Sequence, residues 1–294
     1  MNKFLERLGA GETLVADGAT GTNLQRMGLK AGTPPEDLVM EAPDILLQLA
    51  GSFVDAGSDI ILTCTFGGTR FRMKDSKYAD RVPEVNARAA ELARKAASNR
   101  TGMLVAGSMG PTGTLMKPYG PLDPADARAN YAEQARALAE GGVDLLLIET
   151  MFALDEATAA FDGARSVTDL PIVVSFSYDR GARTMMGVKP TDVMKIYKEK
   201  GAALVGGNCG TTLENMEKVA QEYVAAAPDF PLWIKPNAGL PRMDVATSTA
   251  IYDVTPEMMG EYAKKYVSLG ARIVGGCCGS TPEHVAAIVK AVKG

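Results

Sequence analysis

The sequence predicts an α/β protein of the (β/α)8 TIM barrel type, with a zinc site at the carboxyl ends of its strands. Three observations support this prediction. The chain has 294 residues, a usual length for one such barrel. Eight short apolar runs alternate with eight helical patterns along the chain. Three of the four cysteines directly follow two of the apolar runs. We therefore expect a single barrel domain over residues 1–294.

The strands are expected to be short and buried on both faces. Each apolar run is bounded by Gly, Pro or Asp, and continuous apolar runs of this length are typical of parallel sheets. The eight runs cover residues 13–16, 60–66, 103–107, 145–148, 172–176, 203–206, 232–235 and 273–276.

The helices are expected between these runs. Helical spacing of apolar residues, or Ala-rich composition with charges on one face, predicts helices over residues 44–56, 82–97, 123–139, 155–167, 191–200, 211–225, 255–269 and 282–292. Several begin with a capping residue before Pro, as at Asp123-Pro124. Several end in Gly before the next strand, as at Gly201 and Gly270.

An open, doubly wound sheet is the alternative architecture. It would normally carry a G-x-G-x-x-G motif after an early strand. Here the first run is followed by Asp17-Gly18-Ala19-Thr20-Gly21-Thr22, which is a different motif. The longest strand-to-helix connections, residues 67–81, 110–122 and 238–254, are where a barrel places its substrate contacts.

Composition excludes several classes of function. The formal charge is −4, from 31 Lys and Arg against 35 Asp and Glu, so neither nucleic acid nor a membrane surface is expected as a partner. We find no secretion signal and no membrane span in the sequence. Four cysteines do not make a disulfide framework, and in a cytoplasmic protein they are expected to be ligands or core residues.

In a barrel, the residues at the carboxyl ends of the strands face one pocket. In this chain they are Asp17, Cys64, Ser108, Glu149, Ser177, Cys209, Asn237, Cys277 and Cys278. Polar residues gathered at one end of a buried barrel are expected to be functional.

Cys209, Cys277 and Cys278 are the candidate metal ligands. The flanking glycines, in Asn208-Cys209-Gly210 and around the adjacent pair, let the backbone turn tightly enough for these cysteines to reach one ion. Three thiolates favour zinc and leave its fourth position free for chemistry. Buried free cysteines, or a disulfide between Cys277 and Cys278, are the alternatives.

Asp17 and Glu149 follow apolar runs, so each would be partly buried and would need a cationic or donor partner. They are candidates to hold a substrate ammonium group, or else they are structural partners of an Arg or of backbone amides. Asn237 is a candidate fourth zinc ligand in the absence of substrate, or else a turn residue in Pro236-Asn237-Ala238-Gly239.

Cys64 is expected to be a small buried hydrophobic residue, although as a fourth ligand it would close the metal site. His284 is the only histidine and is expected to be a surface or cap residue at the start of the last helix. Neither Ser-His-Asp hydrolysis nor a His-ligated zinc site is therefore expected.

Motifs along the whole chain resemble the homocysteine S-methyltransferase family, and most closely the homocysteine-binding module of cobalamin-dependent methionine synthase. They are Asp17-Gly18-Ala19-Thr20-Gly21-Thr22, residues 57–63 with Thr65-Phe66-Gly67, Gly110-Pro111-Thr112-Gly113, Glu149-Thr150, Asn208-Cys209, Pro236-Asn237-Ala238-Gly239, and Gly275-Gly276-Cys277-Cys278-Gly279 with Thr281-Pro282-Glu283-His284.

The resemblance implies a zinc barrel that transfers a methyl group to the thiol of homocysteine and forms methionine, from a corrinoid or another small donor. It implies that the zinc ligands Cys209, Cys277 and Cys278 take part in catalysis. Asp17 and Glu149 would hold the amino-acid end of homocysteine, and Asn237 would be a ligand when substrate is absent. A free thiol has a pKa of about 8.5, and binding to zinc would deprotonate it and leave the sulfur nucleophilic.

The resemblance also implies a partner. The chain stops at Gly294, before the folate, cobalamin and reactivation modules of a full methionine synthase. Methylcobalamin would then be carried on a separate corrinoid protein, and homocysteine would be the small-molecule partner.

Two positions depart from the family pattern. Cys64 stands where an Asn is expected, in Thr63-Cys64-Thr65-Phe66, and Ser108 stands where an acidic residue is expected after the third strand. Both are expected to face the pocket. They are therefore candidate substrate-binding residues that bear on the choice of acceptor or donor.

Other functions stay open at this point. A corrinoid-linked demethylase component would use the same barrel to pass methyl groups from a small substrate to a cobalamin protein. A zinc hydrolase is disfavoured by the missing histidines. A non-catalytic barrel would bind zinc through four thiolates, Cys64 included.

Overall fold

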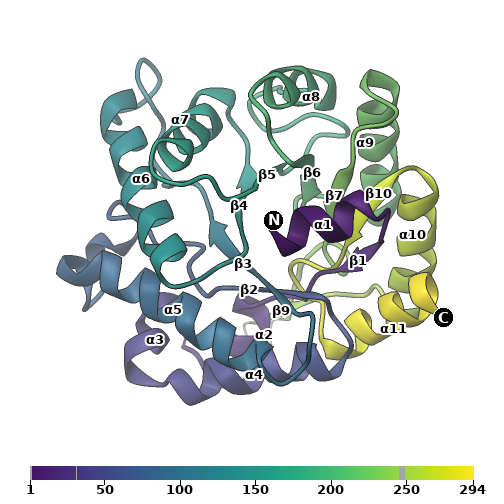
Figure 1. Cartoon of the computed structure of the whole chain (residues 1–294), viewed down its shortest axis with the longest axis horizontal. Helices are drawn as coiled ribbons and strands as arrows, with labels where there is room; N and C mark the ends of the chain where they lie inside the picture. Colours follow the sequence, from purple (N-terminus) through teal and green to yellow (C-terminus); the bar gives the residue numbers. More distant parts are fainter. Residues whose placement is uncertain (1, 31, 245–248) are drawn as a thin grey trace.

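The computed structural model describes residues 2–30, 32–244 and 249–294, and its centre is a barrel of eight parallel strands (Figure 1). The strands are β1 (Leu14–Val15), β2 (Ile60–Leu62), β3 (Leu104–Met109), β4 (Leu145–Met151), β5 (Ile172–Phe176), β6 (Leu204–Asn208), β7 (Leu232–Lys235) and β10 (Ala271–Val274). Their order is β1-β10-β7-β6-β5-β4-β3-β2. A parallel bridge between Ala16 and Ile60 joins the two end strands and nearly closes the barrel.

Helices follow the strands and form the outer ring. They are α4 (Pro43–Asp55), α5 (Val82–Ala97), α6 (Pro124–Glu140), α7 (Leu154–Arg165), α8 (Pro190–Glu199), α9 (Leu213–Ala226), α10 (Pro256–Ser268) and α11 (Pro282–Lys293). Shorter elements are α1 (Lys3–Gly9), α2 (Gly21–Arg26), α3 (Leu38–Glu41), and the 3-10 turns η1 (Pro35–Asp37), η2 (Met73–Asp75) and η3 (Ala79–Arg81).

Alternation along the strands divides the core into two layers. Side chains such as Leu147, Trp233 and Ile273 fill the inside of the barrel, and their neighbours along each strand pack against the helices. Phe4 of α1 is fully buried in the inner layer. In Figure 1, α1 lies across the end of the barrel at which the strands begin. The inner core therefore has a closed base, and the polar strand ends lie at the opposite end, here called the mouth.

The eight predicted strands and eight predicted helices are confirmed, with end points that shift by a few residues. The strand predicted over residues 60–66 is too long, because β2 ends at Leu62. The chain then turns, with the Thr63 hydroxyl 2.6 Å from that of Thr65, so Cys64 lies in a loop.

The predicted long connection 238–254 contains an unexpected antiparallel hairpin, β8 (Arg242–Asp244) and β9 (Thr249–Ile251). Residues 245–248 of that connection lie outside the described residues. None of the described helices combines the length and the apolar character that crossing a membrane requires.

Candidate active site and metal centre

The three predicted cysteine ligands meet at the mouth of the barrel. Cys209 follows β6, and Cys277 and Cys278 follow β10. Their sulfur atoms all lie within 4.8 Å of one another, and the Cys209 and Cys278 sulfurs are 3.7 Å apart. All four cysteines of the chain are free. The alternative of a disulfide between Cys277 and Cys278 is therefore not what the structure contains.

Strand β7 lies between β6 and β10, and its end holds both cysteine loops through backbone hydrogen bonds. The Cys209 amide donates to the Lys235 carbonyl at 3.1 Å, and the Cys277 amide donates to the Pro236 carbonyl at 2.7 Å. The Ala238 amide donates to the Cys278 carbonyl at 2.9 Å. The sulfur cluster is thus positioned by main-chain contacts of three neighbouring strands.

A tight turn brings Cys209 back toward the other two sulfurs. Cys209 has φ of 59° and Gly210 has φ of 72°. The left-handed region is uncommon for a residue with a side chain. A Cβ atom at Gly210 would also collide with the Ser177 hydroxyl. The glycine predicted to permit the turn is therefore required there.

The neighbouring sulfurs and burial act on the pKa of the Cys209 thiol. The contact with Cys277 lowers the pKa of Cys209, but the contact with Cys278 and burial raise the pKa by more, to about 12. A cation is the group that would favour three thiolates at this point. The donor set is the one that zinc prefers.

Asn237 supplies a second group that fits a metal ion at this point. Its side chain is buried, and its Oδ1 atom has no hydrogen-bond partner among the residues that the structure describes. A buried carbonyl oxygen without a partner is costly. Asn237 stands between Pro236 and Ala238, whose main-chain groups bond to Cys277 and Cys278. The orphan oxygen and the three sulfurs together fit a metal ion.

Asn208, the last residue of β6, links the cysteine cluster to neighbouring strands through its side chain. It was not predicted as a site residue. Its Oδ1 accepts hydrogen bonds from the Ser175 hydroxyl at 2.6 Å and the Thr150 amide at 2.9 Å. Its Nδ2 donates to the Thr150 hydroxyl at 2.7 Å and lies 3.8 Å from the Cys277 sulfur. Thr150 has φ of 61°, a strained value for a β-branched residue. Asn208 therefore ties three strands to one ligand.

The two predicted carboxylates lie in the same mouth and are both buried. Asp17 accepts from the Leu62 amide at 2.7 Å and from the Lys235 ammonium at 2.7 Å. Glu149 accepts from the Ser108 hydroxyl at 2.6 Å. Burial raises the pKa of Glu149, although Lys235 and Ser108 oppose the shift. The predicted need for a cationic partner is met by Lys235, which was not among the predicted site residues.

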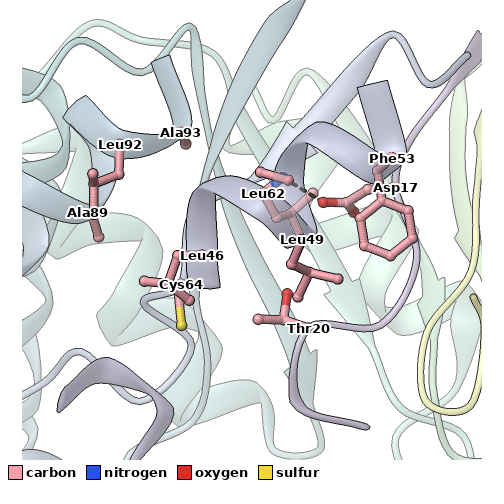
Figure 2. Close-up of a pocket in the computed structure, with 11 residues that line it drawn as sticks. Asp17, Thr20, Leu46, Leu49, Phe53, Leu62, Cys64, Ala89, Leu92 and Ala93 are labelled. Carbon is pink, nitrogen blue, oxygen red and sulfur yellow. Dashed lines mark hydrogen bonds between the residues drawn. The ribbon is translucent and has the colours of Figure 1, made fainter. Parts of the chain in front are cut away.

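Cys64 lies apart from the sulfur cluster. Within the described chain, the group of possible metal ligands contains only the other three cysteines. Cys64 lines a cavity of about 30 Å³ with Asp17, Leu62 and apolar residues of α4 and α5 (Figure 2). Burial and the nearby charge of Glu36 raise the pKa of the Cys64 thiol well above its usual range. Cys64 is a small, partly buried residue packed against the core, rather than fully buried as predicted, and its position gives no support to a four-thiolate site.

Two further residues frame the mouth. Tyr252 follows the hairpin, and burial together with the charge of Cys278 raises the pKa of its phenol to about 12. His284 is buried rather than on the surface, but it is a cap as predicted. Its Nδ1 lies 2.9 Å from the Thr281 hydroxyl, and its Nε2 lies 2.9 Å from the Val254 carbonyl oxygen.

Comparison with known proteins agrees with this arrangement. The family model described as homocysteine S-methyltransferase matches residues 14–292. Methionine synthase of Mycobacterium leprae (strain TN) is 29% identical over 307 residues, which cover 98% of this chain. The match covers 25% of that protein, so the chain spans about a quarter of the length of this relative.

Solved structures show the same fold. The metallated form of the homocysteine methyltransferase MmuM from Escherichia coli has a TM-score of 0.81 at 24% identity, over 98% of this chain and 99% of that one. A methyltransferase from Methanosarcina mazei has a TM-score of 0.60 at 14% identity, over 98% and 96% of the two chains. Because the family model spans nearly the whole barrel, the chain belongs to the homocysteine S-methyltransferase family.

Proposed function

We propose that this protein is a zinc-dependent methyltransferase that methylates the thiol of homocysteine to give methionine. The observation that carries the proposal is the convergence of three cysteine sulfurs within 4.8 Å at the mouth of the barrel. The buried, unpartnered oxygen of Asn237 supports it. Cys209, Cys277 and Cys278 would hold the metal, and Asn237 would occupy the open position in the absence of substrate.

When bound, zinc would supply the Lewis acidity that lowers the pKa of an acceptor thiol and keeps its sulfur nucleophilic. The residues of the chain position the acceptor. Glu149 and Asp17 are the carboxylates available for its amino-acid end, and Ser108 and Cys64 are the neighbouring candidates for contact. Fixing the acceptor sulfur against the methyl donor contributes through orientation.

In the transfer itself, the acceptor sulfur forms a bond to the methyl carbon as the bond from that carbon to the donor breaks. The thiol proton is released. The single histidine, His284, is engaged with Thr281 and Val254, so it is not available as a base. This arrangement supports activation of the thiol by the metal site rather than by a protein base.

We propose methylcobalamin on a separate corrinoid protein as the donor. The likeness to a methionine synthase supports this choice. Exposed apolar side chains also surround the mouth, in the loops after β2, β3, β5 and β7, namely Phe66, Leu115, Tyr119, Met185, Met186, Leu240, Met243 and Ile251. Such a rim is typical of a surface that meets another protein.

Four free cysteines suit a reducing compartment, so we propose a cytoplasmic location.

The test is methionine formation by the zinc-loaded protein from L-homocysteine and methylcobalamin, with zinc content measured on the same sample. We expect methionine in proportion to bound zinc. Full activity without zinc would refute the metal site. Bound homocysteine without product would refute the corrinoid donor and point to a betaine or sulfonium donor.

A further inference from the structure

Lys235 is a buried lysine at the mouth of the barrel. It ends β7, two residues after Trp233, and therefore points into the barrel on the same face as that side chain. Only 2% of its surface is exposed. Burying an ammonium group is expensive unless it is paired. The buried ammonium group of Lys235 therefore requires hydrogen-bond partners.

Asp17 accounts for part of that cost but does not saturate the ammonium group. The Lys235 Nζ donates to Asp17 Oδ1 at 2.7 Å, and both side chains are almost fully buried. An ammonium group carries three donors. Within the described part of the chain, Asp17 Oδ1 is the one acceptor that bonds to it. Further N–H groups of Lys235 are thus free to bond to a ligand.

The polar groups of the mouth are arranged unequally around the ring. Ser108 and Glu149 lie on β3 and β4, whereas Lys235 lies on β7. In a ring of eight strands with this order, β3 and β7 are on opposite sides. Asp17 is already neutralised by Lys235, so Glu149 is the carboxylate left for a cation. Lys235 is nevertheless near enough for its charge to act on Glu149, and the cysteines lie next to Lys235 through the Cys209–Lys235 backbone bond. The mouth therefore offers a group for an anion and a group for a cation close together, beside the cysteines.

We propose that Lys235 binds the carboxylate of the thiol acceptor and so selects acceptors that carry one. This inference rests on the proposed function, since it assumes that a thiol binds at the cysteine cluster. The acceptor would lie with its sulfur at the cluster, its carboxylate at Lys235 and its ammonium group at Glu149. Lys235 is then a specificity-determining residue, and Asp17 keeps its ammonium group in place.

The test uses two fragments of homocysteine with the same thiol chain. The first, 4-mercaptobutyrate, keeps the carboxylate, and the second, 3-aminopropane-1-thiol, keeps the amine. Binding of each to the zinc-loaded protein is measured by anaerobic calorimetry for the native chain and for Lys235→Met. Because Lys235→Met removes a hydrogen-bonded charge, it should lower the affinity for 4-mercaptobutyrate and for homocysteine by about 30-fold. The affinity for 3-aminopropane-1-thiol should change by less than about threefold, because this thiol does not contact Lys235.

An equal loss of affinity for all three thiols in Lys235→Met would show that Lys235 has only a structural role. No loss of affinity for any of them would show that Lys235 does not contact the bound thiol. Lys235→Met leaves Asp17 without its cation, so Asp17→Asn/Lys235→Met is the charge-balanced second variant and should show the same selective loss. Asp17→Asn alone keeps the ammonium group and should still bind 4-mercaptobutyrate.

One comparison needs no variant. The native protein should bind 4-mercaptobutyrate more tightly than its neutral amide, 4-mercaptobutanamide, and equal affinity would overturn the proposal. If the zinc-loaded native protein binds none of these thiols or homocysteine, the proposed function fails. If it binds homocysteine but Lys235→Met keeps the same preference for thiols with a carboxylate, only the proposed role of Lys235 fails.

Discussion

The two ends of the barrel each carry a buried aspartate next to a strand, and the two are satisfied differently. Asp59, just before β2 at the base, accepts from the Val15 amide at 2.8 Å, from Arg7 at 3.0 Å and from Lys293. Asp17, just after β1 at the mouth, accepts from the Leu62 amide and from Lys235, each at 2.7 Å. Two cations bond to one carboxylate at the base, whereas at the mouth Lys235 is a cation shared between the carboxylates of Asp17 and Glu149.

The ionisation of the two regions follows from this difference. Burial raises the pKa of Asp59, but the hydrogen bonds from Lys293 and the Val15 amide, together with Arg7, lower it by more. At the mouth, burial raises the pKa of Glu149, and Lys235 and Ser108 do not cancel the effect.

The mouth also holds the unpartnered Asn237 oxygen and the strained backbone at Thr150 and Cys209. Unsatisfied groups and strain concentrate where a ligand is to bind, and saturated groups where the fold is to be held. Variants at the mouth should therefore change binding and activity, and variants at the base should change stability.

The largest expected effect is at the cluster of Cys209, Cys277 and Cys278, the proposed zinc site. Cys209→Ser should lower zinc affinity by at least about 100-fold and abolish methionine formation, because a thiolate ligand is lost. The folded structure of the metal-free protein should persist. Zinc content after dialysis, measured with circular dichroism of the same samples, checks this.

Cys64→Ser is the matched control, since Cys64 lies outside the sulfur cluster. It should retain zinc. Equal zinc loss in both variants would mean that the cluster of Cys209, Cys277 and Cys278 is not the metal site.

At the base, Phe4→Ala should cost about 4 kcal/mol of unfolding free energy, because the ring is fully buried inside the barrel and leaves a cavity. The kcat/KM of the folded fraction should not change. Leu5→Ala on the same helix is the control, since Leu5 is 44% exposed. A selective loss of homocysteine affinity in Phe4→Ala would break the division between base and mouth.

Asp59→Asn should cost about 2 kcal/mol at pH 7, because Arg7 and Lys293 lose the carboxylate between them. The folded pKa of Asp59 lies below its ordinary value, so its contribution is complete above that ordinary value. The contribution is lost as the pH falls through the folded pKa.

Urea unfolding between pH 2 and pH 8 tests this, and the two proteins should converge in acid. Lys293→Met should cost less than Asp59→Asn, because Arg7 remains. A constant difference between native protein and Asp59→Asn over the whole range would contradict the assigned ion pairs.

The barrel and its cysteine cluster could be predicted from local sequence. The strands are continuous apolar runs, and the cysteines stand beside glycines directly after two of them. Each of these signals lies within about ten consecutive residues. Strand closure then brings Cys209 to Cys277 without any further information, because the ends of parallel strands in a barrel share one face.

Lys235 and Asn208 were missed because their roles depend on distant partners. Lys235 completes the run Leu232-Trp233-Ile234-Lys235 and looks like a polar residue at a strand end, and its pairing with Asp17 spans 218 residues. Alternation from Trp233 would have placed it inside the barrel. Asn208 bonds to Thr150 across 58 residues. The β8–β9 hairpin was missed because its strands are only three residues each and lack an apolar run.

The smallest expected effect is a gain of stability at the mouth. The folded pKa of Glu149 is raised, so its protonated form is the one that the fold favours. The resulting stability is complete below the ordinary pKa of about 4.3 and is lost as the pH rises through the folded value. Glu149→Gln mimics the protonated form and keeps an acceptor for the Ser108 hydroxyl.

Glu149→Gln should therefore be more stable than the native protein at pH 8, and the difference should shrink to nothing in acid. Thermal unfolding at several pH values measures it, with Glu140→Gln on the exposed end of α6 as the control, which should shift stability by less than about 0.5 kcal/mol. The same variant should bind 3-aminopropane-1-thiol more weakly, since the carboxylate of Glu149 is gone. Lower stability at pH 8 would mean that Glu149 is held by its neighbours as firmly as Asp59, and the contrast between mouth and base would not hold.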